Sequence, residues 1–168
     1  MAYRNKTYVC FDGDNDMSYY RLMTAWKAND NSDFNFHNAH DLNSARDTSE
    51  EESIKRQLRE RFANSKLLVV LIGDNTRFLR KFVKWEMEVA LRLNMPIVGV
   101  NLNGERYRTE LCPATIRDEL AIYVPFKQKI IQHAMDNWPE DHARRKKAGE
   151  TGPFYYNDSV YTKLGLYS

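Results

Sequence analysis

The feature that most constrains the fold is the run 67-LLVVLI-72, in which every residue is aliphatic. A strand with one wet face alternates apolar and polar side chains, so a run without alternation predicts a central strand covered on both faces. The run is also far too short to span a bilayer, which needs about 20 apolar residues. It therefore predicts the middle of a buried, mainly parallel sheet with helices on both faces.

Other short apolar or aromatic segments alternate along the chain with segments of helical periodicity. Strands are predicted at residues 7–11, 34–40, 67–72, 97–102 and 121–126. Helices are predicted at about residues 17–28, from 48 onward, 79–94, 114–120 and 127–137. Strands that alternate with helices indicate βαβ units. We expect an α/β, flavodoxin-like doubly wound fold with a five-stranded, mainly parallel sheet in the order 2-1-3-4-5.

Folds of this kind bind ligands outside the carboxyl ends of the strands, at the switch point between the first and third strands. That rule selects two loops, 11-FDGDND-16 and 73-GDNT-76. At least one of the aspartates at 12, 14 and 16 is expected to cap the following helix.

We expect one α/β domain over residues 1–137 and a C-terminal extension over residues 138–168. In the extension, the basic run 144-RRKK-147 is expected to be a solvated loop. The aromatic stretch 154–167 is expected to pack on the same domain or on a partner subunit, because so much apolar surface is seldom left exposed.

Composition narrows the function classes. The net charge is only +2, which gives no argument for a nucleic-acid partner. The N-terminus lacks the apolar core of a signal peptide, and no segment predicts a membrane span. Two cysteines are too few for a disulfide framework, and Cys10 lies in an apolar run, so we expect a buried free thiol and a cytoplasmic protein. The four histidines have no zinc spacing with the cysteines, so no metal site is predicted.

The stretch 82-FVKWEMEVAL-91 holds two glutamates, and helical periodicity separates them. Glu88 falls in a ladder with Lys84 and Arg92 at i, i+4 spacing, which is typical of a solvent-facing helix surface. Glu86 falls in the middle of the apolar stripe, flanked by Leu79, Phe82, Val83, Val89, Ala90 and Leu93. A carboxylate there is either held by a buried partner or placed at a cleft for chemistry.

Four segments in order carry a resemblance to a known family. They are 9-VCFDGDND-16, 65-SKLLVVLIGDNT-76, 82-FVKWEMEVAL-91 and 96-PIVGVNL-102. Together they resemble the bacterial TIR-like proteins, which include the TIR component of the Thoeris anti-phage systems, over roughly residues 6–102. Many family members have Trp where this chain has Phe82, and Ser where it has Cys10.

The resemblance implies an enzyme that cleaves the bond between nicotinamide and ribose in NAD, with NAD as substrate and no cofactor. It implies products such as ADP-ribose or a cyclic isomer, which would carry a diffusible signal to a downstream effector protein, and a possible homo-oligomer. The family's catalytic glutamate stands where this chain has Glu86. Phe11, Asp12, Tyr19 and Trp85 are the expected substrate-binding companions.

Two other functions remain open on the same fold. One is a TIR-like adaptor without catalysis, which acts through protein contacts and uses Glu86 as a structural carboxylate. The other is a receiver-type phospho-acceptor domain, in which Asp12, Asp14, Asp74 and Lys127 would have to fill the acidic and lysine positions. Against it, Asp74 follows a glycine in a loop, and no Ser or Thr ends the strand at residues 100–101.

Overall fold

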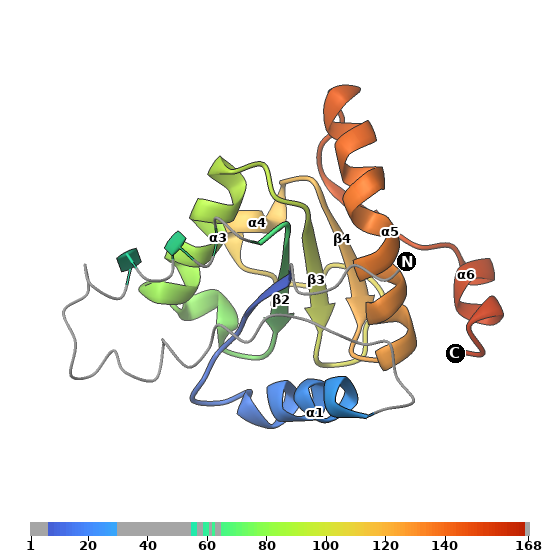
Figure 1. Ribbon diagram of the computed structural model, residues 1–168, viewed down its shortest axis with the longest axis horizontal. Helices are drawn as coiled ribbons and strands as arrows, with labels where there is room; N and C mark the ends of the chain where they lie inside the picture. Colours follow the sequence, from blue (N-terminus) through green and yellow to red (C-terminus); the bar gives the residue numbers. More distant parts are fainter. Residues whose placement is uncertain (1–6, 30–54, 57–58, 61, 63–64, 167–168) are drawn as a thin grey trace.

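The computed structural model of the chain describes residues 7–29, 55–56, 59–60, 62 and 65–166. Its centre is a sheet of five parallel strands in the order β1-β2-β3-β4-β5 (Figure 1). The strands are β1 (Thr7–Cys10), β2 (Leu67–Ile72), β3 (Ile97–Asn101), β4 (Ala121–Pro125) and β5 (Pro153–Tyr155). The run 67-LLVVLI-72 is β2, and all of its residues are buried, as predicted for a central strand.

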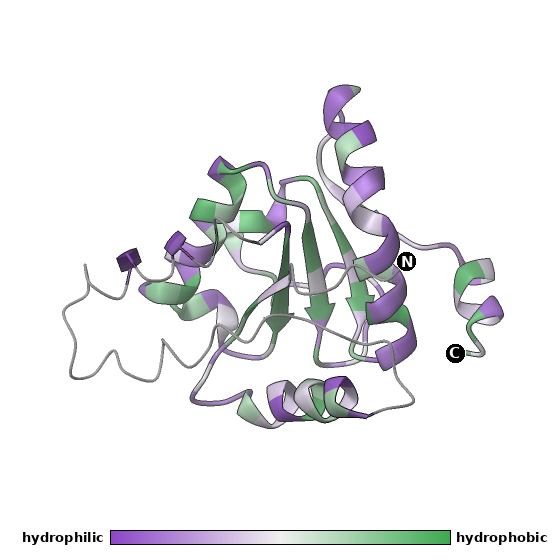
Figure 2. Ribbon diagram, viewed as in Figure 1, coloured by the Kyte–Doolittle hydropathy of each residue, from purple (hydrophilic) through white to green (hydrophobic). Residues whose placement is uncertain are grey.

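Helices cover both faces of the sheet. They are α1 (Met17–Ala28), the 3-10 turn η2 (Thr76–Phe78), α3 (Phe82–Arg92), α4 (Ala114–Arg117), α5 (Gln128–Lys147) and α6 (Asp158–Lys163). α3 and α4 pack on one face, whereas α1, α5 and α6 pack on the other. The strands are apolar and the outer surfaces of the helices are polar, which gives a three-layer α/β/α arrangement (Figure 2). Within the described residues, no helix has the length and apolar character needed to cross a bilayer.

The alternation of side chains along β1 assigns its residues to the two faces. Tyr8 and Cys10 belong to the core under α3, whereas Val9 and Phe11 belong to the core under α1 and α5. This is the period of two that a strand imposes. This alternation determines which candidate site residues lie on the same face of the sheet as Glu86.

The α/β, flavodoxin-like prediction is confirmed, with one difference in the sheet. The predicted first, third, fourth and fifth strands are β1 to β4 and adjoin in the predicted order. The predicted strand at residues 34–40 lies outside the described residues, as does the helix start predicted at residue 48 or 49. The fifth described strand, β5, was not predicted and comes from the C-terminal extension, where it pairs with the outer edge of β4.

The helix expected to end at Asn137 instead continues to Lys147, so the solvated loop predicted for 144-RRKK-147 is wrong. The helix passes through Pro139, although a proline disfavours helical backbone at the preceding residue and lacks an N–H donor. Burial of Trp138 and His142 on either side of the proline holds the helix on the sheet. The boundary drawn between residues 137 and 138 therefore falls inside α5.

Candidate functional site

The two glutamates of α3 occupy opposite environments, as helical periodicity predicted. Glu86 is buried with an exposed fraction of 0%, whereas Glu88 is exposed together with Lys84 and Arg92. The predicted apolar stripe is also confirmed over Phe82, Val83, Val89 and Ala90, which are all buried. Leu93 departs from it: α3 ends at Arg92, and the side chain of Leu93 is 54% exposed.

Glu86 takes part in a small polar group between α3 and β1. The hydroxyl of Tyr8 donates a hydrogen bond to Oε2 of Glu86. The thiol of Cys10, two residues along the same face of β1, donates to the backbone carbonyl of Val83 across 3.8 Å. The carboxylate is thus buried among groups from one strand and one helix, with a phenol hydroxyl fixing one of its oxygens.

Cys10 is a protonated, inward-facing thiol. Burial raises its pKa well above the ordinary value, and the nearby charge of Glu86 raises it further. Its hydrogen bond goes to the backbone carbonyl of Val83, so the sulfur ties α3 to the sheet. Both cysteines are free and buried, as predicted for Cys10.

A cleft of about 150 Å³ opens at the carboxyl end of β1, where the switch-point rule places a ligand. Residues 12–14 form one wall, and residues 79–83, which lead into α3, form the other. Glu86 itself does not line this cleft. It lies one helical turn beyond Phe82 and Val83, and helical side chains lean toward the N-terminus, so its carboxylate lies behind the inner wall.

Asp12 lines the cleft, but its oxygens shape the turn after β1. One carboxylate oxygen accepts the backbone N–H groups of Asp14 at 3.0 Å and Asn15 at 3.3 Å, and the other accepts Nδ2 of Asn15 at 2.7 Å. The residue is 2% exposed. Asp12 therefore holds the cleft wall in shape. The N-cap position of α1 belongs to Asp16, without a side-chain capping bond.

The remaining candidates do not gather around Glu86. Phe11 is buried on the opposite face of the sheet, where its ring stacks on Tyr20 with centroids 4.5 Å apart. Tyr19 lies on that face too, edge-on to Phe126. Trp85 shares the α3 face with Glu86 and is half-buried beside Phe62. The sheet thus separates Phe11 and Tyr19 from the glutamate.

Three residues that the sequence analysis did not single out belong to this region. Tyr8 holds the carboxylate, and the alternation in 7-TYVCF-11 was a signal for it because that alternation places Tyr8 and Cys10 on one face. Arg80 and Lys81 are exposed cations on the wall of the cleft. Adjacent cations just before 82-FVKWE-86 were their only sequence signal.

Asp16 is a buried acid at this edge of the sheet. It is 7% exposed, and its Oδ2 has no hydrogen-bond partner in the part of the chain that the structure describes. A Cβ added at Gly73 would lie 2.3 Å from that oxygen, so glycine is what lets the carboxyl fit against the end of β2. Burial, together with repulsion from Asp12 and Asp74, raises the pKa of Asp16 to about 6.

The raised pKa of Asp16 makes an expected contribution to the pH dependence of stability. The folded state favours the protonated carboxyl of Asp16. Its contribution to the free energy of unfolding is therefore complete below the ordinary pKa of 3.8 and is lost as pH rises through about 6. At pH 7, Asp16→Asn is therefore expected to raise the free energy of unfolding by on the order of 1–2 kcal/mol over the wild type. Near pH 4 the two proteins are expected to be equally stable. Urea unfolding at both pH values measures this, with the exposed Asp14→Asn as control. Equal gains at both pH values would contradict the assignment.

A comparison with known families agrees with the four segments that carry the resemblance. The family model described as Thoeris protein ThsB, TIR-like domain, matches residues 8–107, which is more than half of the chain. The match runs from β1 through β3 and includes Glu86, Tyr8, Cys10 and both walls of the cleft. α4, β4, α5, β5 and α6 lie beyond it. The chain belongs to the Thoeris ThsB TIR-like domain family, a TIR-like fold of anti-phage defence.

Proposed function

We propose that this domain cleaves the nicotinamide–ribose bond of NAD, with Glu86 as the catalytic carboxylate. The observation that carries the proposal is a carboxylate fully buried in the apolar stripe of α3, held by the Tyr8 hydroxyl, one turn from a cleft at the carboxyl end of β1. Buried carboxylates are unfavourable for folding unless something compensates them, and such groups gather at sites of chemistry. Membership of the TIR-like family supports the same reaction.

Cleavage of the nicotinamide–ribose bond requires only one carboxylate. The bond between C1′ of the ribose and the ring nitrogen breaks, and its electron pair leaves on nicotinamide, which departs neutral. The positive charge that develops at C1′ is oxocarbenium-like, and the negative charge of Glu86 stabilises it. A water molecule, or a hydroxyl of the ADP-ribose itself, then adds to C1′ and releases a proton. The first path gives ADP-ribose and the second a cyclic isomer.

The cleft supplies groups of the right kind for the rest of the dinucleotide. Arg80 and Lys81 are exposed on its wall and would pair with the diphosphate. Asp12 would line the ribose end through the turn that it holds. Trp85 would bound the pocket on the α3 side. Phe11 and Tyr19 would act from the opposite face by fixing the end of β1 and the start of α1.

Substrate access to Glu86 requires this region to open. The cleft of about 150 Å³ is smaller than the ~300–1,000 Å³ of typical ligand pockets, and the carboxylate is fully buried. We propose that the present form is latent and that separation of the first turn of α3 from the end of β1 joins the cleft to Glu86. Assembly into a homo-oligomer is one event that could drive this step, and the released nucleotide would then act on an effector protein.

The test is nicotinamide release from NAD, followed by chromatography over a range of protein concentrations and with crowding agents. Wild-type protein is expected to release nicotinamide with an equal amount of ADP-ribose or its isomer. Turnover that is equal in the wild type and in Glu86→Gln would overturn the proposal. Phosphate uptake from acetyl phosphate without nicotinamide release would favour the receiver-type function instead.

A further inference from the structure

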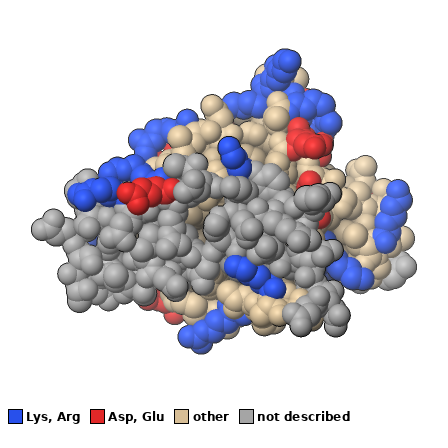
Figure 3. Space-filling model, viewed as in Figure 1, with Lys and Arg blue, Asp and Glu red and all other residues tan. Residues whose placement is uncertain are grey.

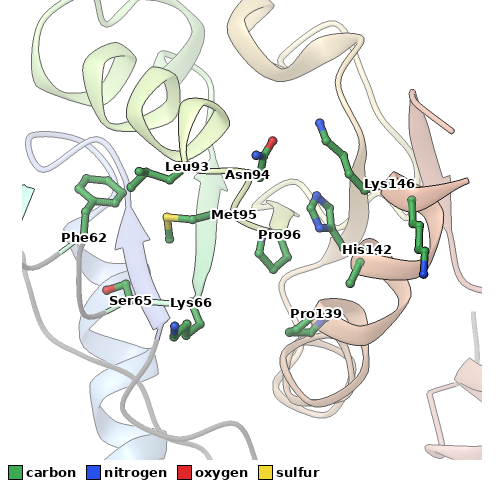
Figure 4. A pocket seen from close by; sticks show the side chains of 12 residues that line it. Phe62, Ser65, Lys66, Leu93, Asn94, Met95, Pro96, Pro139, His142 and Lys146 are labelled. Carbon is green, nitrogen blue, oxygen red and sulfur yellow. The ribbon is translucent and has the colours of Figure 1, made fainter. Parts of the chain in front are cut away.

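A second and larger cavity lies at the opposite end of the sheet. It has a volume of about 680 Å³ and is bounded by the entry into β2, the turn between α3 and β3, and the last turns of α5 (Figure 4). All strands are parallel, so this cavity lies at their amino ends, away from the cleft beside Glu86. We call it the amino-end groove and define it by Lys66, Met95, Pro96, Pro139, His142 and Lys146. Its volume lies within the ~300–1,000 Å³ range of small-ligand pockets.

The groove carries positive charge that the described carboxylates do not neutralise. Lys66, Lys146 and Lys147 line it and are exposed, and none of the twelve residues that line it is acidic. Figure 3 shows Lys and Arg side chains gathered over the end of α5. Among the described salt bridges, Arg144 pairs with Asp141 and Arg145 with Glu150. The three lysines take no part in those bridges, so their charge faces the groove and its rim.

One side of the groove is apolar. Met95 and Pro96 belong to the turn that leads into β3, and Pro139 faces them from α5 (Figure 4). Leu93, which the helical pattern placed in the buried stripe, lines the groove with an exposed fraction of 54%. A surface of this kind suits the flat face of an aromatic ring. It would add little to the binding of a bare inorganic ion.

His142 joins the charged side to the apolar side. Its ring is buried beside Trp138, with centroids 6.1 Å apart, and it lines the groove next to Lys146 (Figure 4). Burial, and the charge of Lys146, lower its pKa below the ordinary value, so the ring is neutral at pH 7. An anion bound against Lys146 would oppose that effect and raise the pKa. A rise in the pKa of His142 would therefore show that an anion has bound in the groove.

We propose that the amino-end groove is a second ligand site, which binds a phosphorylated molecule of nucleotide size. Lys66, Lys146 and Lys147 hold the phosphates, and Met95, Pro96 and Leu93 contact the ring. The site is independent of NAD cleavage, because it lies at the other end of the sheet and shares no residue with the cleft. It offers the protein a place to sense an anionic metabolite while the site near Glu86 is closed.

The experiment titrates the full chain with ADP in the absence of divalent metal and follows the imidazole resonances by NMR. The His142 resonance is assigned with His142→Asn. ADP is expected to raise the pKa of His142 and to bind more tightly than pyrophosphate, whereas adenosine is expected not to bind. Lys66→Gln/Lys146→Gln should weaken ADP binding by about tenfold or more, because it removes two charge-assisted contacts to the phosphates, each weakened by exposure to solvent.

The matched control is Lys129→Gln/Lys163→Gln, which removes the same charge from exposed positions outside the groove. It should change ADP affinity less than about twofold, since distant surface charges contribute little. Equal affinity of the two double variants would overturn the proposal, as would an ADP titration that leaves His142 unchanged. Binding that Arg80→Gln abolishes would place ADP in the cleft instead. If pyrophosphate binds as tightly as ADP, the proposed contact between the ring and the apolar side of the groove is wrong. If an acidic peptide binds and ADP does not, the groove is a site for a protein partner.

Discussion

Replacement of Glu86 by Gln is expected to lower the rate of nicotinamide release at least about 100-fold. The amide keeps the volume of the side chain and can still accept the hydrogen bond from the Tyr8 hydroxyl. It loses the negative charge that stabilises the developing positive charge at C1′. The loss is therefore expected in kcat, because the interaction is strongest in the transition state.

The same substitution is expected to leave the protein folded and no less stable. Glu86 is buried among apolar side chains, so removal of its charge relieves a desolvation penalty. Thermal unfolding measured beside the activity therefore separates catalysis from structure. A variant that loses both activity and fold would contradict the assignment and point to the structural carboxylate of an adaptor.

Two further variants sharpen this result. Glu88→Gln removes the same charge from the exposed face of α3 and is expected to change the rate less than about twofold. Tyr8→Phe removes the hydroxyl that positions the carboxylate and is expected to lower kcat by about tenfold with little change in KM. A change in KM alone would show that Tyr8 acts on substrate binding.

The separation of Glu86 from Glu88 could be predicted from the sequence because it depends only on helical periodicity. Which strand residues meet Glu86 could be predicted only in part. Alternation along 7-TYVCF-11 places Phe11 on the face opposite Tyr8 and Cys10, but it does not say which face α3 covers. The face that α3 covers depends on how the chain crosses from β2 to β3, and the sequence of a single strand does not determine that.

The C-terminal part could not be predicted for a different reason. Pro139 reads as a helix stop in a local pattern, and a three-residue strand such as β5 is too short to show a period. Both elements form through contacts with distant parts of the chain: α5 through burial against the sheet and β5 through pairing with β4. The aromatic residues that mark this region were visible in the sequence, but their partners were not.

Replacement of Trp138 by Ala is expected to lower the free energy of unfolding by about 3–5 kcal/mol, the largest stability effect that we predict. The side chain is 1% exposed and belongs to the core under α1, α5 and α6, with Phe154 of β5 at a ring distance of 6.0 Å. Its removal leaves a cavity between α5 and the sheet at the point where the family match has already ended. Urea unfolding followed by far-UV circular dichroism gives the midpoint and slope.

Two controls decide whether this loss reflects the core. The Nε1 atom of Trp138 has no hydrogen-bond partner among the described residues, so Trp138→Phe gives up no polar contact and is expected to cost only about 1 kcal/mol. Phe78→Ala removes an aromatic ring that is 58% exposed and is expected to cost less than about 1 kcal/mol. If Trp138→Ala were as stable as Phe78→Ala, the residues after 137 would contribute little to the stability of the domain. If it unfolds as predicted, the second half of α5, together with β5, completes the same cooperative unit as the TIR-like core, because the lost contacts join them.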